Sequence, residues 1–232
     1  MDTERTPNHD AGRVALRVGI VFGGAFALTV ALGSLLGLAW ADDGSIAFDS
    51  AITRWFVDHR TPAWTDAMRA VTWLGSSAVV IPLAVVVSVA LVICRRRWLA
   101  LFVILAVGGA SLLSILTKEV VQRSRPPVGV HLQQPHSSAF PSGHSTQAAA
   151  TYFALALVVT VVGRSRLLSV LAWTAATLIV FLVGVSRVYL GVHWATDVLG
   201  GWLLGSVWVA GLAMALAPLA ADSRVRPPQH GA

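Results

Sequence analysis

Six long apolar stretches constrain the fold of this chain more than any other feature of its sequence. Each is long enough to cross the hydrocarbon core of a bilayer, which needs about 20 helical residues. Because lipid offers no hydrogen bonds to a polypeptide backbone, each stretch is predicted to be a helix. The charged fraction of 12% is far below that of soluble domains and excludes a soluble globular protein. The predicted spans are Val14–Trp40, Val71–Cys94, Trp98–Thr117, Thr146–Val162 (beginning near Ser142), Leu167–Val185 and Val198–Leu216.

Arginines occur in four groups beside these stretches, and with six spans all four groups fall on one side of the membrane. The groups are Arg5, Arg13 and Arg17; Arg95 to Arg97; Arg164 and Arg166; and Arg224 and Arg226. The positive-inside rule makes this side cytoplasmic. The same rule explains the formal net charge of +6, so no nucleic-acid partner is predicted. The polar segments around Lys118–Ser145 and His193 are then predicted to share the non-cytoplasmic side.

The chain is predicted to form one membrane domain, residues 13–217, between disordered cytoplasmic ends at residues 1–12 and 218–232. The first stretch also resembles a signal peptide, because Arg13 and Arg17 precede an apolar run that ends in Ala39-Trp40-Ala41. Signal peptides have apolar cores of about 7–15 residues, so this much longer run favours an uncleaved anchor.

The segment between the first two spans differs from them in pattern. Phe48, Ile52, Trp55 and Phe56 lie at helical spacing within residues 46–60. This spacing predicts a short amphipathic helix on the outer membrane surface. The alternative is a solvated loop that packs on the bundle.

Three polar clusters interrupt the apolar pattern, and charges at or within a membrane are functional candidates. They are Lys118 with Arg125-Pro126; Pro141-Ser142-Gly143-His144; and Ser186-Arg187 with His193 and Asp197. Lysine supplies a point charge, and arginines supply planar forks that match phosphate oxygens. A helix N-terminus presents free N–H groups to an anion. Ser142 and Gly143 are therefore expected to hold phosphate oxygens through their amides and one hydroxyl.

The two histidines are suited to phosphoryl transfer. His144 can donate a proton to a leaving oxygen. His193 and Asp197 are four residues apart and share a face if both are helical. The carboxylate can then accept from one ring nitrogen and leave the other free to attack phosphorus. A lone histidine at a membrane interface usually packs or is solvated, but three clusters on one predicted face favour catalysis.

Other polar residues near the clusters are given structural interpretations. Glu119 and Arg123 are expected to be solvated or paired with each other at four-residue spacing. His131 and His136 are expected to be loop residues, and Gln147 either supports the site or faces the bundle. No Cys/His or carboxylate cluster indicates a metal centre, so neither a metal nor a cofactor is predicted.

The three clusters resemble the motifs of the phosphatidic acid phosphatase type 2 superfamily, which includes lipid phosphate phosphatases and vanadium haloperoxidases. The family pattern is lysine, six residues and Arg-Pro; then Pro-Ser-Gly-His; then Ser-Arg, five residues, His, three residues and Asp, and this chain matches it throughout. The resemblance implies that His193 attacks as the nucleophile, that Asp197 orients it and that His144 protonates the leaving group. It also implies phosphate binding by Lys118, Arg125, Ser142, Gly143 and Arg187, without a metal.

We therefore expect an all-α polytopic membrane protein, with six transmembrane helices in a bundle and a short amphipathic interfacial helix. It is expected to sit in the plasma membrane and to hydrolyse a lipid phosphomonoester or diphosphate, with undecaprenyl diphosphate favoured by the outward-facing site. A glycerophospholipid phosphatase and a phosphotransferase that uses a lipid or sugar acceptor are the alternatives. A scaffold or transporter has no need of an acid, a nucleophile and phosphate ligands together. The oligomeric state is left open.

Overall fold

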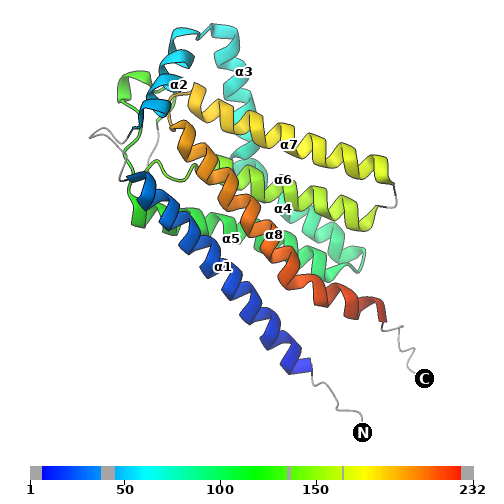
Figure 1. The fold of residues 1–232 in the computed structure, drawn as a ribbon. Coiled ribbons are helices and arrows are strands. Elements are labelled where there is room, and N and C mark those ends of the chain that lie inside the picture. The colour runs from blue at the N-terminus through cyan, green and yellow to red at the C-terminus, as the bar shows by residue number, and fades with distance from the viewer. Residues whose placement is uncertain (1–6, 38–44, 135–136, 164, 226–232) are drawn as a thin grey trace, which may run out of the picture.

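The computed structural model describes residues 7–37, 45–134, 137–163 and 165–225, and every regular element within these ranges is helical. The elements are α1 Pro7–Gly37, α2 Ala47–Asp58, α3 Pro62–Thr72, η1 Trp73–Gly75, α4 Ser77–Ile93, α5 Arg97–Val121, η2 Val128–Val130, α6 Gly143–Val162, α7 Arg166–Tyr189 and α8 Ala195–Val225. The start of α1 and the end of α8 lie at one end of the molecule, and α2 and α3 lie at the other (Figure 1). The prediction of an all-α bundle is confirmed.

Helix α6 is the centre of the bundle and packs against α5, α7 and α8 (Figure 1). Most of its residues are buried, and many are alanines, so neighbouring helices approach closely. A Cβ atom on Gly201 of α8 would lie 2.7 Å from the backbone oxygen of Ser142, and one on Gly205 would lie 2.7 Å from that of Thr146. The two glycines therefore bring the start of α8 directly against the start of α6.

Five helices are long and apolar enough to cross a membrane, and six spans result if one bent pair is counted as a single span. The bent pair corrects the second predicted span, Val71–Cys94. The chain there forms α3, η1 and then α4, with a bend of 42° at Ser76. Ser76 is extended, and a Cβ on Gly75 would lie 2.8 Å from the backbone oxygen of His144. The bend therefore lies against the start of α6.

Both ends of the chain contain more helix than the sequence predicted. Helix α1 begins at Pro7, and proline suits the first turn of a helix because its missing N–H would be unpaired there. Helix α8 continues to Val225, past Pro218. These boundaries correct the expected disorder of residues 7–12 and 218–225. The remaining terminal residues and the Ala39-Trp40-Ala41 sequence lie outside the described residues.

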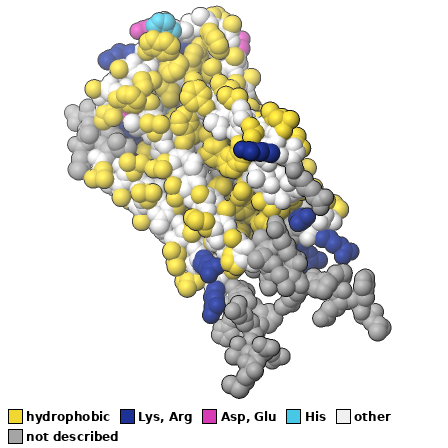
Figure 2. Space-filling model, turned by 45° about the vertical axis from the view of Figure 1, so that its right-hand side comes forward, with side chains coloured by type: hydrophobic (Ala, Val, Ile, Leu, Met, Phe, Trp, Pro, Cys, Tyr) yellow, Lys and Arg dark blue, Asp and Glu magenta, His cyan; other side chains and the backbone are white. Residues whose placement is uncertain are grey.

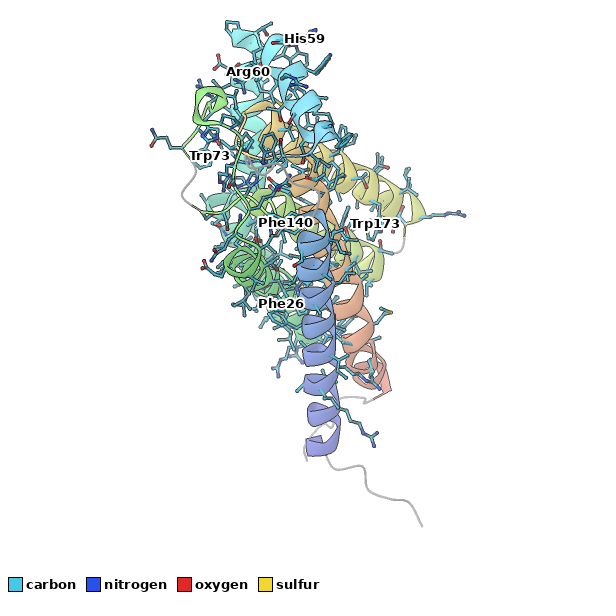
Figure 3. All side chains as sticks on the ribbon, turned by 60° about the vertical axis from the view of Figure 1, so that its left-hand side comes forward. Phe26, His59, Arg60, Trp73, Phe140 and Trp173 are labelled. Atoms are coloured by element: carbon cyan, nitrogen blue, oxygen red, sulfur yellow. The ribbon has the colours of Figure 1, made fainter. Side chains whose placement is uncertain are left out.

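The predicted amphipathic helix is present as α2, so the loop alternative is wrong. Phe48 and Trp55 are exposed on its outer face, whereas Asp49 and Thr53 are buried against the bundle. Helix α3, which the sequence did not predict as a separate element, packs on α7 beside it. Arg60, between the two helices, donates from its side chain to the backbone oxygens of Tyr189 and Val130, and it lies at this end of the molecule in Figure 3. Both helices are thereby held over the end of the bundle.

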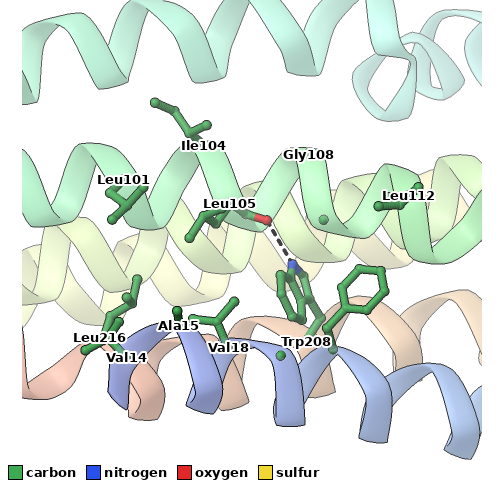
Figure 4. A pocket seen from close by; sticks show the side chains of 13 residues that line it. Val14, Ala15, Val18, Leu101, Ile104, Leu105, Gly108, Leu112, Trp208 and Leu216 are labelled. Atoms are coloured by element: carbon green, nitrogen blue, oxygen red, sulfur yellow. Dashed lines mark hydrogen bonds between the residues drawn. The ribbon is translucent and has the colours of Figure 1, made fainter. Parts of the chain in front are cut away.

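The outer surface matches a membrane environment. Hydrophobic side chains cover most of the face in Figure 2, with Lys and Arg gathered mainly towards its lower end. A wide apolar groove also runs between α1, α5 and α8, and its lining includes Val18, Gly108 and Trp208 (Figure 4). The Trp208 ring nitrogen donates to the backbone oxygen of Leu105 at 3.1 Å. The polar atom of this large side chain is thus satisfied within the bundle.

Candidate functional site

The three sequence clusters come together at the end of the bundle that α2 and α3 cover. Lys118 is in the last turn of α5 and Arg187 in the last turn of α7. Asp197 lies in the first turn of α8. The remaining residues come from the start of α6 and from the loops that follow α5 and α7. They are Arg125, Ser142, Gly143, His144 and His193.

His193 is held by its neighbours in one orientation. Its ring Nδ1 lies 3.3 Å from Asp197 Oδ2, and the same oxygen accepts from the Trp194 backbone N–H at 2.9 Å. The two residues do not share a helical face, because His193 precedes the start of α8 at Ala195. Their contact instead closes the turn that begins α8. His193 is 2% exposed, so its environment is almost wholly protein.

The other ring nitrogen of His193 faces Arg125. The Nε2 atom is 3.2 Å from Arg125 Nη1, which also donates to the backbone oxygen of Val192. Burial lowers the pKa of His193 well below its usual value, and the positive charges of Arg125, Lys118 and Arg187 lower it further. The imidazole is therefore neutral at physiological pH, as a nucleophile must be.

Three cations in the site have neutral hydrogen-bond acceptors. Lys118 Nζ donates to the backbone oxygen of Ser138, and Arg125 Nε donates to that of Ser137 at 2.6 Å. Arg187 donates to Thr72 Oγ1 at 2.8 Å and to Gln133 Oε1 at 2.9 Å. Because these acceptors carry no formal charge, the cations retain a net positive field that favours an anion such as phosphate.

The start of α6 agrees with the prediction in part. Ser142 is the N-cap residue, and its hydroxyl accepts from the backbone N–H of Ser145 at 3.4 Å. Its own backbone N–H donates to the backbone oxygen of Asp197 at 2.9 Å, so the expected contact of this amide with phosphate is wrong. Gly143 and His144 occupy the first turn, where N–H groups point away from the helix and can bind an anion.

The loop that leads into α6 is anchored by Phe140. This ring is completely buried, and a Cβ on Gly33 of α1 would lie 2.9 Å from it. Gly200 of α8 leaves space for the other edge of the same ring. The side chain lies beside α1 in Figure 3. Phe140 thus fixes the approach of residues 137–142 to the site.

Arg123 is a site residue that sequence reasoning missed. It was expected to be solvated or paired with Glu119, but it is 2% exposed and contacts Asp197, the carboxylate beside His193. Its Nη1 atom donates to Asp197 Oδ1 and its Nη2 atom to Asp49 Oδ2, both at 2.6 Å. Asp49 also accepts from the hydroxyl and the backbone N–H of Thr196. A buried Asp49–Arg123–Asp197 network therefore joins α2 to the residue that orients His193. The one sequence signal for this network was Asp49, an acidic residue within the predicted amphipathic helix.

Other candidate residues have structural partners. His131 Nε2 lies 2.8 Å from the backbone oxygen of Pro126, which agrees with a loop role. His136 lies outside the described residues. Gln147 and Glu119 line a pocket beside His144. Within the described ranges, no group of three His, Cys, Asp or Glu side chains is arranged to hold a metal ion.

Comparison with known proteins identifies the family. The PAP2 superfamily matches residues 97–218 of this chain. Phosphatidylglycerophosphatase B of Bacillus subtilis is 39% identical over 162 residues, which are 68% of this chain and 77% of the relative. Undecaprenyl-diphosphatase of Sulfolobus acidocaldarius is 32% identical over 136 residues, or 56% of this chain and 60% of the relative.

Solved structures show the same fold. A transmembrane PAP2-type phosphatidylglycerolphosphate phosphatase from Bacillus subtilis superposes with a TM-score of 0.71 at 31% identity, over 87% of this chain and 97% of that one. Aquifex aeolicus LpxE, at 24% identity, superposes with a TM-score of 0.59 over 73% of this chain and 97% of that one, which shows the fold alone. The chain belongs to the PAP2 superfamily. It is a multi-pass membrane lipid phosphatase of that family, so the resemblance in its motifs is confirmed.

Proposed function

We propose that this membrane lipid phosphatase hydrolyses its substrate through a phosphohistidine on His193. The observation that carries the proposal is the setting of His193, which is oriented by Asp197 at 3.3 Å and approached at Nε2 by Arg125 at 3.2 Å. With the Nδ1 proton donated to the carboxylate, the Nε2 lone pair is free to attack. Lys118, Arg125 and Arg187 then hold the phosphate oxygens, where charge gathers during transfer.

The reaction has two steps. In the first, Nε2 forms a bond to phosphorus as the bond to the leaving oxygen breaks, and protonated His144 donates its proton to that oxygen. Asp197 stabilises the positive charge on the His193 ring. In the second step His144 accepts a proton from water, whose oxygen attacks phosphorus. The N–P bond breaks, phosphate leaves, and His193 returns to its neutral form.

Arg125 is expected to move during this reaction. Its Nη1 lies beside the nitrogen that must bind phosphorus, so it moves from Nε2 onto a phosphate oxygen when substrate enters. Gly143 contributes its backbone N–H, and the Ser142 hydroxyl can still donate while it accepts from Ser145.

The site is proposed to face the non-cytoplasmic side. It lies at the end of the bundle away from the described start of α1 and end of α8. Arg95 and Arg96 lie in the α4–α5 connection and Arg97 begins α5, and the positive-inside rule places such a basic segment in the cytoplasm. The substrate is a phospho- or diphospholipid whose tail remains in the bilayer, which limits its search and orients its head group. Undecaprenyl diphosphate and glycerophospholipid phosphates both have this form.

Phosphate release from a panel of lipid phosphates tests the mechanism. Wild type is expected to release phosphate with excess chelator present, and His193→Ala to lose the activity. His59→Ala, which changes an exposed histidine at the C-cap of α2, is the matched control and should remain active. Acid-labile, base-stable label on wild-type protein after a rapid quench would identify the phosphohistidine. Activity that survives in His193→Ala removes the nucleophile assignment. Label that appears on an added acceptor, with little free phosphate, favours the transferase alternative.

A further inference from the structure

Arg187 is the most deeply buried of the three cations that are proposed to bind phosphate. It is 6% exposed, whereas Lys118 is 9% exposed and Arg125 is half-buried. Its Nη1 atom donates both to Thr72 Oγ1, at 2.8 Å, and to Gln133 Oε1, at 2.9 Å. Because Nη1 carries two hydrogens, these two acceptors use both of them.

The Nε atom of the same guanidinium has a hydrogen to donate. It is buried, and nothing among the described residues accepts from it. Buried donors are nearly always paired, because leaving one without a partner is costly. The Nε hydrogen and one hydrogen of Nη2 point in the same direction, and together they match two oxygens of a phosphate. The guanidinium of Arg187 is therefore held through one nitrogen and keeps its Nε–Nη2 edge for an oxyanion.

Both acceptors are themselves fixed in place. Thr72 is the last residue of α3 and is 3% exposed. Leu132, the neighbour of Gln133, donates its backbone N–H to the backbone oxygen of Leu190 at 2.9 Å, and its side chain packs on a cluster that includes Met68 of α3. The two acceptors thus come from separate parts of the chain that meet at one guanidinium.

The Gln133 amide can face Arg187 only through its oxygen. All the nitrogens of a guanidinium donate and none accepts, so the amide nitrogen would find no partner there. This oxygen and the Thr72 hydroxyl are neutral, so they orient the guanidinium without cancelling its charge. A long side chain that is already held in place also loses less entropy when a phosphate binds to it.

We propose that Thr72 and Gln133 are positioning residues for phosphoryl transfer, which hold Arg187 with its Nε–Nη2 edge towards the phosphate. Both residues act through Arg187 and not on the substrate itself. The inference rests on the proposed function, in which Arg187 holds phosphate oxygens where charge gathers during transfer. Loss of either acceptor should therefore lower kcat more than it raises KM, because an oriented donor matters most in the transition state.

The variants Thr72→Val, Thr72→Ser and Gln133→Leu test this proposal in the full chain, in mixed micelles. We would measure kcat and KM for the best lipid phosphate of the panel, and Ki for inorganic phosphate as a competitive inhibitor. Thr72→Val keeps the shape of the side chain but removes the hydroxyl. It should lower kcat about 10-fold, the lower end of the effect of a hydrogen bond to a charged group, and raise Ki. Gln133→Leu should act in the same way, and Thr72→Ser, which keeps the hydroxyl, should retain most of the wild-type kcat and Ki.

Thr65→Val and Gln134→Leu are the matched controls. Thr65 lies on the same helix as Thr72, and its hydroxyl contacts the Tyr189 hydroxyl at 3.0 Å, so this variant also loses a hydrogen bond. Gln134 is the exposed neighbour of Gln133. Both controls should keep the wild-type kcat and Ki. Melting temperatures identify the folded variants, and Gln133→Leu, which changes a half-buried loop residue, tests the proposal even if Thr72→Val does not fold.

Unchanged kcat and Ki in Thr72→Val and Gln133→Leu, a loss in Thr72→Ser as large as that in Thr72→Val, or equal losses in the controls would overturn the positioning role. Tighter binding of inorganic phosphate by Gln133→Leu would also overturn it, because Gln133 would then compete with phosphate for Arg187. The acid-labile label should still form in Thr72→Val, but more slowly. Absence of this label from wild type would instead remove the proposed function.

Discussion

Replacing Arg123 with methionine tests whether a buried ion network sets the geometry of the site. Arg123 pairs with Asp49 of α2 and Asp197 of α8, each at 2.6 Å, and the three side chains are fully buried. Methionine keeps an apolar stem of similar length but removes the guanidinium. Two buried carboxylates would then remain without the cation that lies between them.

The expected loss of stability is large. Removing one member of a buried ion pair costs about 3–5 kcal/mol, because the charge that remains is uncompensated. Asp197 also loses a charge-assisted hydrogen bond of about 1.5–3 kcal/mol. If the free energy of this hydrogen bond is lost from the orientation of His193 in the transition state, kcat falls about 10- to 150-fold, since each tenfold change in rate corresponds to about 1.36 kcal/mol. Asp49→Asn should have a smaller effect, because the Arg123–Asp197 pair survives.

The assay combines thermal unfolding in detergent with kcat and KM for Arg123→Met, Asp49→Asn and the double variant. We expect kcat to fall more than KM rises, because Arg123 acts through Asp197 and does not touch substrate. The double variant should cost less than the sum of the single variants, since the residues share one network. Arg69→Met is the matched control, because the Arg69–Asp66 pair is exposed at 3.6 Å and such pairs contribute below about 1 kcal/mol. A melting temperature and a kcat in Arg123→Met that equal those of wild type would refute the proposal that this ion network sets the geometry of the site.

Two further predictions follow from burial and packing. The pKa of His193 is lowered by burial and by neighbouring cations, so the folded protein resists protonation there. The unfolded chain then binds more protons than the folded protein, so wild type should lose stability as the pH falls below about 6.5. His193→Ala should lose less stability over the same range. Equal losses of melting temperature in the two proteins from pH 7.5 to 5 would contradict this prediction. Gly205→Ala would place its Cβ 2.7 Å from the Thr146 backbone oxygen, so it should destabilise the α6–α8 contact by about 1–3 kcal/mol. Gly108→Ala meets no atom within 4 Å and should be neutral or stabilising by melting temperature, and equal effects of the two substitutions would argue against close packing.

Features that depend on residues close together in the chain could be predicted from the sequence. The helical spans follow from hydrophobicity, because a bilayer leaves the backbone few alternatives to a helix. Ser142 as the start of α6 follows from the preference of serine for the N-cap position. The three motifs could be recognised because their residues are near one another in the chain and their spacing is specific.

The tertiary structure alone decided which distant residues meet. Arg123 contacts Asp49 across 74 positions, and Gln147 contacts Ser111 across 36. The bend at Ser76 similarly depends on the close approach of Gly75 to α6. Hydropathy and capping describe each helix separately, whereas these contacts arise from how the helices are rotated and packed against one another. A buried charge needs a partner, but the sequence does not say which residue that partner is. The Asp49–Arg123–Asp197 network therefore became visible only once α2, the loop after α5 and α8 were placed together.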